Sequence, residues 1–452
     1  MPSEPSRTLA AAPLPGLFSR GYLWVTIGSC ALVFLAAFES LAVTTVMPIV
    51  SADLSGANLY ALAFAGPLAT GVIGMVVAGN WCDRVGPVMP LYTSAVLFAL
   101  GLIVAGVAST MPMLVSGRLL QGLGGGGTTV ALYVVVARVY PARLHPSIFA
   151  GFAAAWVIPS LIGPLAAGVV AETWSWHWVF LGVVGLVAMA TGMIVPALRG
   201  LERGPGDTPV APWAGGRIVW SIIAAGCVLA LGLLGDIPHV GGLLAVIAAV
   251  IAIIAVRPLL PRATLLSRRG LPSVILLRGL AAAAYFGAEV YLPYLLIDHY
   301  EFSAKLAGLA LTLGAIAWAG SSWLQGRMTV SLSNATCTVA GCALVIVAIA
   351  IAYVTAQFSL PPLIAIVGWA VAGGGMGLMY PRMSTMTLSF SVPGNQGFNS
   401  SALTIADSLG GALALAVTGL VFATASFAGV FAFTAVIAVV ALVIAPRVTT
   451  RD

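Results

Sequence analysis

The stretch Gly117–Gly127 reads GRLLQGLGGGG and places two polar residues, Arg118 and Gln121, just inside an apolar segment that runs to Val136. An arginine keeps its positive charge in proteins, so within a bilayer its side chain must face a protein interior and meet a partner. The glycines that follow leave one face of a helix without side chains, which lets a neighbouring backbone pack closely. The stretch therefore predicts a membrane-spanning helix that carries a buried polar site.

The composition of the whole chain supports this prediction. Hydrophobic residues make up 60% of its 452 positions and charged residues only 7%, whereas soluble domains carry about 25% charged residues. Long apolar runs recur along the length, so we predict an all-α polytopic membrane protein. The net charge of +6 comes from arginines scattered through short loops, which indicates membrane topology rather than nucleic-acid binding.

The sequence contains no motif of a disulfide framework, a metal site, a phosphate loop or a catalytic nucleophile. The five cysteines form no CxxC pair and the four histidines are dispersed over loops on both sides, which argues against disulfides and a metal site. The glycine run has no following Lys-Ser/Thr and sits in an apolar segment, so it is no phosphate loop. No nucleophile–base pair stands out, and we predict neither an enzyme nor a bound cofactor.

Apolar runs of about 20 residues, the length needed to cross a bilayer, predict fourteen spans. Their expected ranges are 22–48, 58–79, 88–107, 112–137, 146–171, 177–197, 218–235, 240–256, 272–297, 304–325, 333–355, 361–381, 396–424 and 427–446. With the N-terminus inside, thirteen arginines fall on the cytoplasmic side, and the alternate loops hold five acids with Lys305 as their one basic residue. By the positive-inside rule both termini are therefore expected in the cytoplasm.

The two halves of the chain resemble each other. Three glycine-containing stretches recur at an offset of about 245–250 residues, among them GRLLQGLGGG from Gly117 and GWAVAGGGMG from Gly368. A repeated six-helix unit is the plan of many transporters. The predicted organisation is a cytoplasmic tail (1–21), an N-terminal six-helix bundle (22–198), a linker with two extra spans (199–270), a C-terminal six-helix bundle (271–446) and a cytoplasmic tail (447–452).

Three motifs resemble those of the major facilitator superfamily, in its fourteen-spanner drug:proton antiporter branch. The loop signature G-x-x-x-D-R-x-G is matched by Gly79, Asp83, Arg84 and Gly86. The R-x-x-Q-G-x-G signature is matched by Arg118, Gln121, Gly122 and Gly124. The antiporter signature around G-P-x-x-x-G is matched by Pro159, Gly163, Pro164 and Gly168.

The resemblance implies roles for two of these motifs. Asp83 and Arg84 are expected in the loop after the second helix, where the aspartate can cap a helix N-terminus or pair with arginines across the halves, and the family uses it as a conformational latch. A plain solvated loop with an arginine that orients the helices is the alternative. Arg327 keeps the basic member in the second half. The kinked helix with Pro159 and Pro164 is expected to seal the interface between the halves, although ordinary helix packing would give the same pattern.

Intramembrane acids are the candidates for proton coupling. Glu39 and Arg118 fall at similar depth and are expected to meet, either as a coupling pair or as a static ion pair. Glu289 is a second candidate, whose neighbours Tyr285, Phe286, Tyr291 and Tyr294 form either the wall of a substrate cavity or an interfacial belt. Asp407 is expected to be protonated or paired across helices, whereas Arg278 and Arg382 lie close enough to the cytoplasmic ends to snorkel.

The resemblance implies a secondary transporter of the plasma (inner) membrane that exports a hydrophobic or amphipathic compound in exchange for protons. It is expected to be driven by the proton gradient, to need no cofactor and to act as a monomer. Three alternatives remain open: an exporter of an endogenous lipid, siderophore or metabolite, an uptake symporter, and a membrane scaffold without transport.

Overall fold

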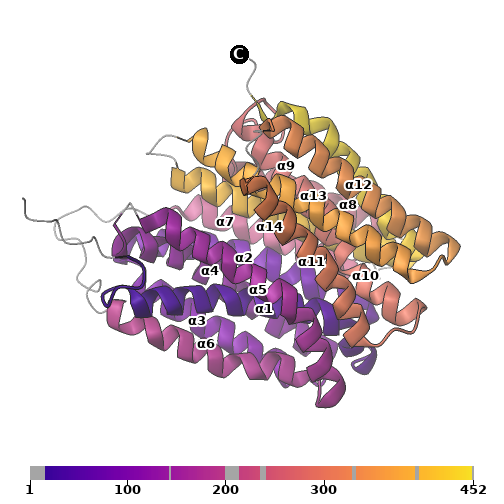
Figure 1. Cartoon of the computed structure of the whole chain (residues 1–452), viewed down its shortest axis with the longest axis horizontal. Coiled ribbons are helices and arrows are strands. Elements are labelled where there is room, and N and C mark those ends of the chain that lie inside the picture. The colour runs from indigo at the N-terminus through magenta and orange to yellow at the C-terminus, as the bar shows by residue number, and fades with distance from the viewer. Residues whose placement is uncertain are drawn as a thin grey trace, which may run out of the picture.

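The computed structural model describes residues 16–141, 144–198, 213–234, 241–327, 332–391 and 396–449, whose regular structure is helical (Figure 1). Four short helical turns at 57–59, 257–259, 295–299 and 445–448 accompany the longer elements. In chain order the helices are α1 (Leu23–Asp53), α2 (Tyr60–Val85), α3 (Val88–Gly106), α4 (Met111–Val139), α5 (His145–Thr173), α6 (His177–Leu198), α7 (Gly215–Leu234), α8 (Gly241–Val256), α9 (Leu271–Glu289), α10 (Tyr291–Tyr294), α11 (Ala304–Arg327), α12 (Asn334–Phe358), α13 (Pro362–Ser389) and α14 (Gln396–Ile444).

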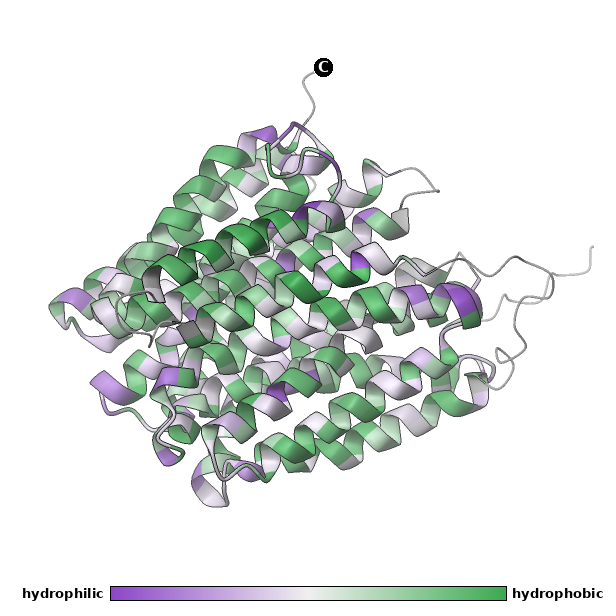
Figure 2. Cartoon of the chain, turned by 180° about the vertical axis from the view of Figure 1, so that it is seen from behind, coloured by the Kyte–Doolittle hydropathy of each residue, from purple (hydrophilic) through white to green (hydrophobic). Residues whose placement is uncertain are grey.

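Helix length and hydropathy define a multi-pass membrane protein. Ten helices in the described ranges are long and apolar enough to cross a bilayer, and bent α5 brings the number to eleven. One of the ten covers 51 residues, about 75 Å of helix, which is more than twice the roughly 30 Å hydrocarbon core. It breaks at Ser426, whose φ of 56° and ψ of −163° are not helical. Figure 2 shows hydrophobic residues along the lengths of the helices.

The predicted ranges agree with these helices to within a few residues at most ends, and three helices run further. Helix α1 continues through Pro48 to Asp53, α2 reaches Val85 and α13 reaches Ser389. The tail before residue 16, the predicted aqueous loop at 199–212 and the turn at 235–239 lie outside the described residues.

Glycines set the packing of α4 between α2 and α3. A Cβ added at Gly126 would overlap the backbone carbonyl of Gly71 on α2. On another side of α4, a Cβ at Gly124 would lie 2.5 Å from the carbonyl oxygen of Ser94 on α3. Only glycine permits such approaches of helix backbones. The GRLLQGLGGGG stretch therefore lets α4 fit closely against two neighbours at once.

Helix α13 repeats this arrangement between α11 and α12. A Cβ at Gly373 would overlap the carbonyl of Gly314 on α11, and one at Gly375 would lie 2.6 Å from the carbonyl oxygen of Gly341 on α12. The glycines of the second stretch thus do the same packing work as those of the first.

Helices α1–α6 pack mainly on one another, as do α9–α14, and the two groups meet through α5 with α11 and through α2 with α14. Both meetings include contacts near the end of the molecule at which α1 ends and α2 begins, called here the outer end. There Gly168 on α5 lies against Lys305 at the start of α11, and Gly419 on α14 lies against Ala61 on α2.

Helices α7 and α8 follow the first group in sequence and pack on each other. Helix α7 also packs on α2 and on α14, so it contacts both groups. Asn80 on α2 accepts a hydrogen bond from the backbone of Ala214 (2.8 Å), and the guanidinium of Arg217 lies 4.9 Å from the ring centre of Phe398 on α14.

Candidate functional site

The first candidate site joins α1, α2 and α4. Arg118 Nη1 donates to the carboxylate of Glu39 and also to the side-chain oxygen of Gln121, while Arg118 Nε donates to the backbone oxygen of Ala63 at 3.1 Å. The Glu39 and Arg118 side chains are each only 6% exposed. The expected meeting of these residues therefore occurs, and the guanidinium is satisfied from three helices.

The second candidate site lies between α9 and α13. The carboxylate of Glu289 lies beside the side chains of Tyr285 and Trp369. Trp369 is fully buried, and its indole nitrogen forms no hydrogen bond of normal geometry with the described residues. Within those residues Glu289 also forms no ion pair. This acid is thus placed among neutral donors.

A third site joins α9, α13 and α14. Arg278 Nε donates to Asp407 at 2.7 Å, and the Tyr380 hydroxyl donates to the same carboxylate oxygen at 2.9 Å. The Arg278 guanidinium also stacks 3.5 Å from the centre of the Tyr380 ring. The pair is less buried than the first, with side chains 16% and 24% exposed. Asp407 is thus paired across helices, and the snorkelling expected of Arg278 is wrong because its guanidinium reaches this carboxylate instead.

The aromatic candidates lie in packed clusters. Tyr285 is buried with its ring edge-on to Phe286 and Trp318 and 5.2 Å from Trp369. Tyr291 and Tyr294 lie 5.9 and 4.7 Å from Tyr60 on α2, ring centre to ring centre.

The Tyr60 hydroxyl reaches across to the Val290 carbonyl at 3.0 Å, so these rings join the two helix groups at the outer end. Tyr291 is therefore buried between the two helix groups, whereas Tyr294 is half-buried.

The predicted latch is helical. Gly79, Asp83 and Arg84 lie in the last turns of α2, and Gly86 follows with φ of 91°. The expected loop position is wrong because the helix continues to Val85, so Asp83 stands at a helix C-terminus and caps no N-terminus.

The Asp83 side chain is exposed, whereas the Arg84 guanidinium lies 5.1 Å from the Trp213 ring centre. The side chain of Arg327 lies outside what the structure describes.

The antiporter motif lies where three helices meet. Helix α5 bends by 41° between Ser147–Ser160 and Ile162–Thr173, a break flanked by Pro159 and Pro164. Gly163 faces α1, and Gly168 faces the backbone of Lys305 on α11. The Lys305 backbone N–H also donates to Glu172 at 2.8 Å. This motif therefore lies at the contact between the two helix groups.

Sequence reasoning did not find the partners of the second and third sites. Arg278 and Asp407 are 129 positions apart, and no helical spacing links them. For Trp369 a signal existed: it follows Arg118 by 251 positions, and Glu289 follows Glu39 by 250. Applying the repeat offset to the Glu39–Arg118 pair would have put Glu289 beside Trp369.

The fold is that of a polytopic helical membrane protein, and comparison with known proteins identifies a transporter. The sequence profile of the Major Facilitator Superfamily matches residues 29–367, so the chain belongs to this family. The chain is a transporter of a small molecule and not an enzyme.

Two bacterial relatives align over most of their length. The chain is 28% identical over 432 residues to a probable multidrug-efflux transporter of Mycobacterium tuberculosis, covering 90% of this chain and 89% of that one. It is 23% identical over 412 residues to a multidrug efflux pump of Staphylococcus aureus, covering 88% and 89%.

Solved structures share the fold at low identity. A peptide transporter in complex with sulfate matches with a TM-score of 0.69 at 16% identity, covering 97% of each chain. A D-xylose-proton symporter matches with a TM-score of 0.65 at 12% identity, covering 94% of this chain and 98% of that one.

Proposed function

We propose that this chain is a proton-coupled exporter of hydrophobic or amphipathic compounds, a multidrug:proton antiporter of the plasma membrane that acts as a monomer. Support for the substrate class comes from the two bacterial relatives, which are described as multidrug-efflux proteins. Support for the coupling comes from carboxylates at Glu39, Glu289 and Asp407 within the spans, because intramembrane acids are rare without a function.

The observation that carries the proposal is the setting of Glu289. Glu39 and Asp407 each form an ion pair with an arginine, which retains its charge in proteins. Among the described residues Glu289 forms no ion pair, and its neighbours include the Tyr285 phenol and the Trp369 indole. A carboxyl group in this setting has no fixed counter-charge among the described residues, so it can change its protonation state without breaking an ion pair. Glu289 is therefore the site that gains and loses the coupled proton, and Glu39 with Arg118 acts as a structural pair.

The proposed topology has fourteen spans with both termini cytoplasmic, arranged as six helices, two linker helices and six helices. It counts α5 as one bent span, α14 as two spans broken at Ser426, and α7 and α8 as short spans. In this topology the outer end is extracellular, and its closure by Tyr60, Tyr291 and Tyr294 corresponds to an inward-facing state.

Alternating access then follows from rocking of the two groups around the midplane. A proton taken by Glu289 from outside favours return to the inward-facing state, and its loss to the cytoplasm favours loading of substrate. The exposed Asp83 is free to act as the latch when the cytoplasmic ends close.

The test is efflux of a cationic dye from proteoliposomes under an imposed pH gradient. The wild type should lose transport when the gradient is collapsed. Glu289→Gln should keep downhill dye exchange yet lose its response to the gradient. Gradient-driven efflux by Glu289→Gln at the wild-type rate would move the coupling site elsewhere, and wild-type efflux that ignores the gradient would end the antiport proposal.

A second candidate is export of an endogenous lipid, siderophore or metabolite. Over 167 residues the chain is 29% identical to a transporter from a fungal biosynthesis cluster, covering 37% of this chain and 30% of that one. Screening both drugs and lipids in the same proteoliposomes separates the two candidates. Uptake with a proton, in place of release against it, would instead indicate a symporter.

A further inference from the structure

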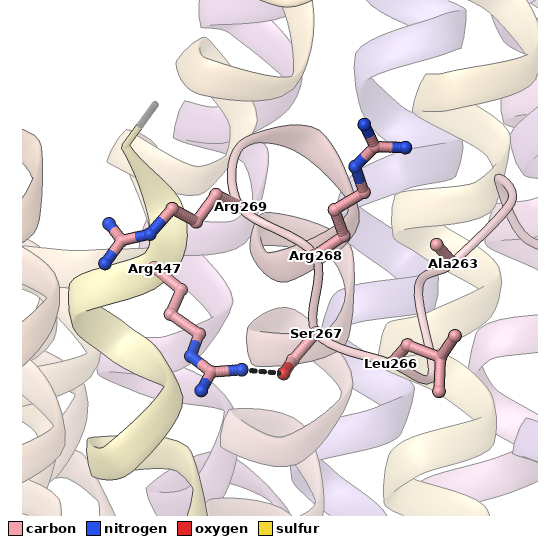
Figure 3. Close-up of a pocket in the computed structure, with 6 residues that line it drawn as sticks. All are labelled: Ala263, Leu266, Ser267, Arg268, Arg269 and Arg447. Atoms are coloured by element: carbon pink, nitrogen blue, oxygen red, sulfur yellow. Dashed lines mark hydrogen bonds between the residues drawn. The ribbon is translucent and has the colours of Figure 1, made fainter. Parts of the chain in front are cut away.

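A group of three arginines shares one open cavity at the end of the molecule opposite the outer end. The cavity has a volume of about 500 Å³, and its lining consists of Ala263, Leu266, Ser267, Arg268, Arg269 and Arg447. Figure 3 shows Arg269 and Arg447 on the same side of the loop, with Arg268 extending from its other side. All three arginines are exposed, and none forms an ion pair with a described residue.

The cavity is built from two segments that are held together. The Gly270 N–H donates to the Arg447 carbonyl at 3.0 Å, and Arg447 Nη1 donates to the Ser267 hydroxyl at 2.6 Å. The Ser273 hydroxyl in turn donates to the carbonyls of Ser267 and Arg268 at 2.9 and 2.8 Å. The loop that carries Arg268 and Arg269 is thus tied to both α9 and the turn at 445–448, which holds the two backbone segments of the cavity together.

The charges lie where a lipid-facing surface ends. Val436, Val440 and Val443 on α14 are exposed, and their spacing places them on one helix face. Arg447 lies in the short 3₁₀ turn at 445–448 that directly follows this helix. Beside it, Leu265 and Leu266 are 41% and 79% exposed. A ligand with both an acyl chain and an anionic head would find apolar surface for the chain directly next to guanidinium groups for the head.

We infer that this cavity binds the phosphate headgroup of an acidic phospholipid, with the acyl chains lying along the exposed face of α14. Guanidinium groups form paired hydrogen bonds with phosphate oxygens. Basic pockets at the cytoplasmic side of membrane helices are a recurrent setting for anionic lipid heads. The segment 257–270 contains no acidic residue, so nothing in it repels such a head. The inference does not depend on the proposed export activity.

The test is lipid binding to the purified full-length protein in neutral detergent, measured by native mass spectrometry. Phosphatidylglycerol should bind more tightly than phosphatidylcholine, and added salt should weaken only the former. The triple variant R268Q/R269Q/R447Q should lose about fivefold in affinity for each arginine removed. The matched control R257Q/R262Q removes two exposed arginines of the same segment that do not line the cavity, and it should bind like the wild type.

Several outcomes would overturn the inference. Equal affinities for the two lipids would show that the site does not recognise the charge of the headgroup. A triple variant that binds phosphatidylglycerol like the wild type would show that these arginines do not form the binding site. Displacement of the lipid by inorganic phosphate at millimolar concentration would identify a soluble anion as the ligand. If the triple variant does not fold, the single variant R447Q and the salt dependence of the wild type decide the question.

Discussion

The two helix groups carry a glutamate at related positions but surround it differently. Glu39 lies against Arg118, and Glu289 lies against Trp369 and Tyr285. The frame around each acid is similar, since α4 and α13 both fit between two neighbours through glycines that contact backbone carbonyls. The comparison teaches that one architecture supports two electrostatic environments. In the proposed mechanism, the residue opposite the acid decides whether that acid is a fixed charge or an exchangeable one.

Removing the cation should have the largest effect. Arg118→Met leaves Glu39 buried without a partner, and we expect a loss of about 3–5 kcal/mol in the free energy of unfolding. Thermal unfolding of the purified variant measures this loss. The double variant Glu39→Gln/Arg118→Met should recover most of it because the uncompensated charge is gone. A stable single variant would mean that Glu39 takes up a proton readily, which would abolish the contrast with Glu289.

Adding a methyl group at the close glycine contacts of α4 and α13 should destabilise the protein by a similar amount in both groups. Gly126→Ala and Gly373→Ala each push a Cβ into a backbone carbonyl, at an expected cost of about 1–3 kcal/mol for overpacking. Gly374→Ala is the matched control, since nothing lies within 4 Å of its added Cβ. Unfolding midpoints of the three variants test the comparison. A large loss in one group alone would show that the two frames are not equivalent.

The Asp407–Arg278 pair should be less costly to break. Asp407→Asn leaves a guanidinium that is still partly exposed and stacked on Tyr380, so we expect a loss of about 1–2 kcal/mol, between the values for surface and buried pairs. The same unfolding measurement applies, with Thr404→Ala, an exchange one turn earlier on α14, as the control. A loss as large as that in Arg118→Met would place this pair with the first site.

Trp369→Phe should have the smallest effect on stability, about 1 kcal/mol. It keeps an aromatic ring but removes the indole N–H beside Glu289. Because Glu289 is the proposed proton site, changing the side chain beside it should shift the pH of half-maximal gradient-driven transport. Trp318→Phe, which lies near Tyr285 without contributing to the Glu289 environment, should leave that pH unchanged. An unchanged pH profile in Trp369→Phe would argue that Glu289 does not carry the coupled proton.

Helix positions were predictable because apolar runs of sufficient length have few alternatives in a bilayer. The meeting of Glu39 and Arg118 was predictable for a similar reason, since a buried guanidinium requires a partner at its own depth. The Arg278–Asp407 pair was not predictable, because distant helices in the sequence bring these side chains together. Asp83 was misplaced by a few residues because hydropathy does not mark where a helix ends among polar side chains.

Helix α7 gives the molecule two unlike flanks. The residue before it, Ala214, donates a hydrogen bond to Asn80 on α2, and the helix itself packs on α2 and α14. The seam between α2 and α14 is thus covered by an additional helix, whereas no extensive packing of α7 or α8 on α5 or α11 occurs among the described residues. Access from the surrounding lipid to the two seams is therefore unequal, because an extra helix covers the seam between α2 and α14.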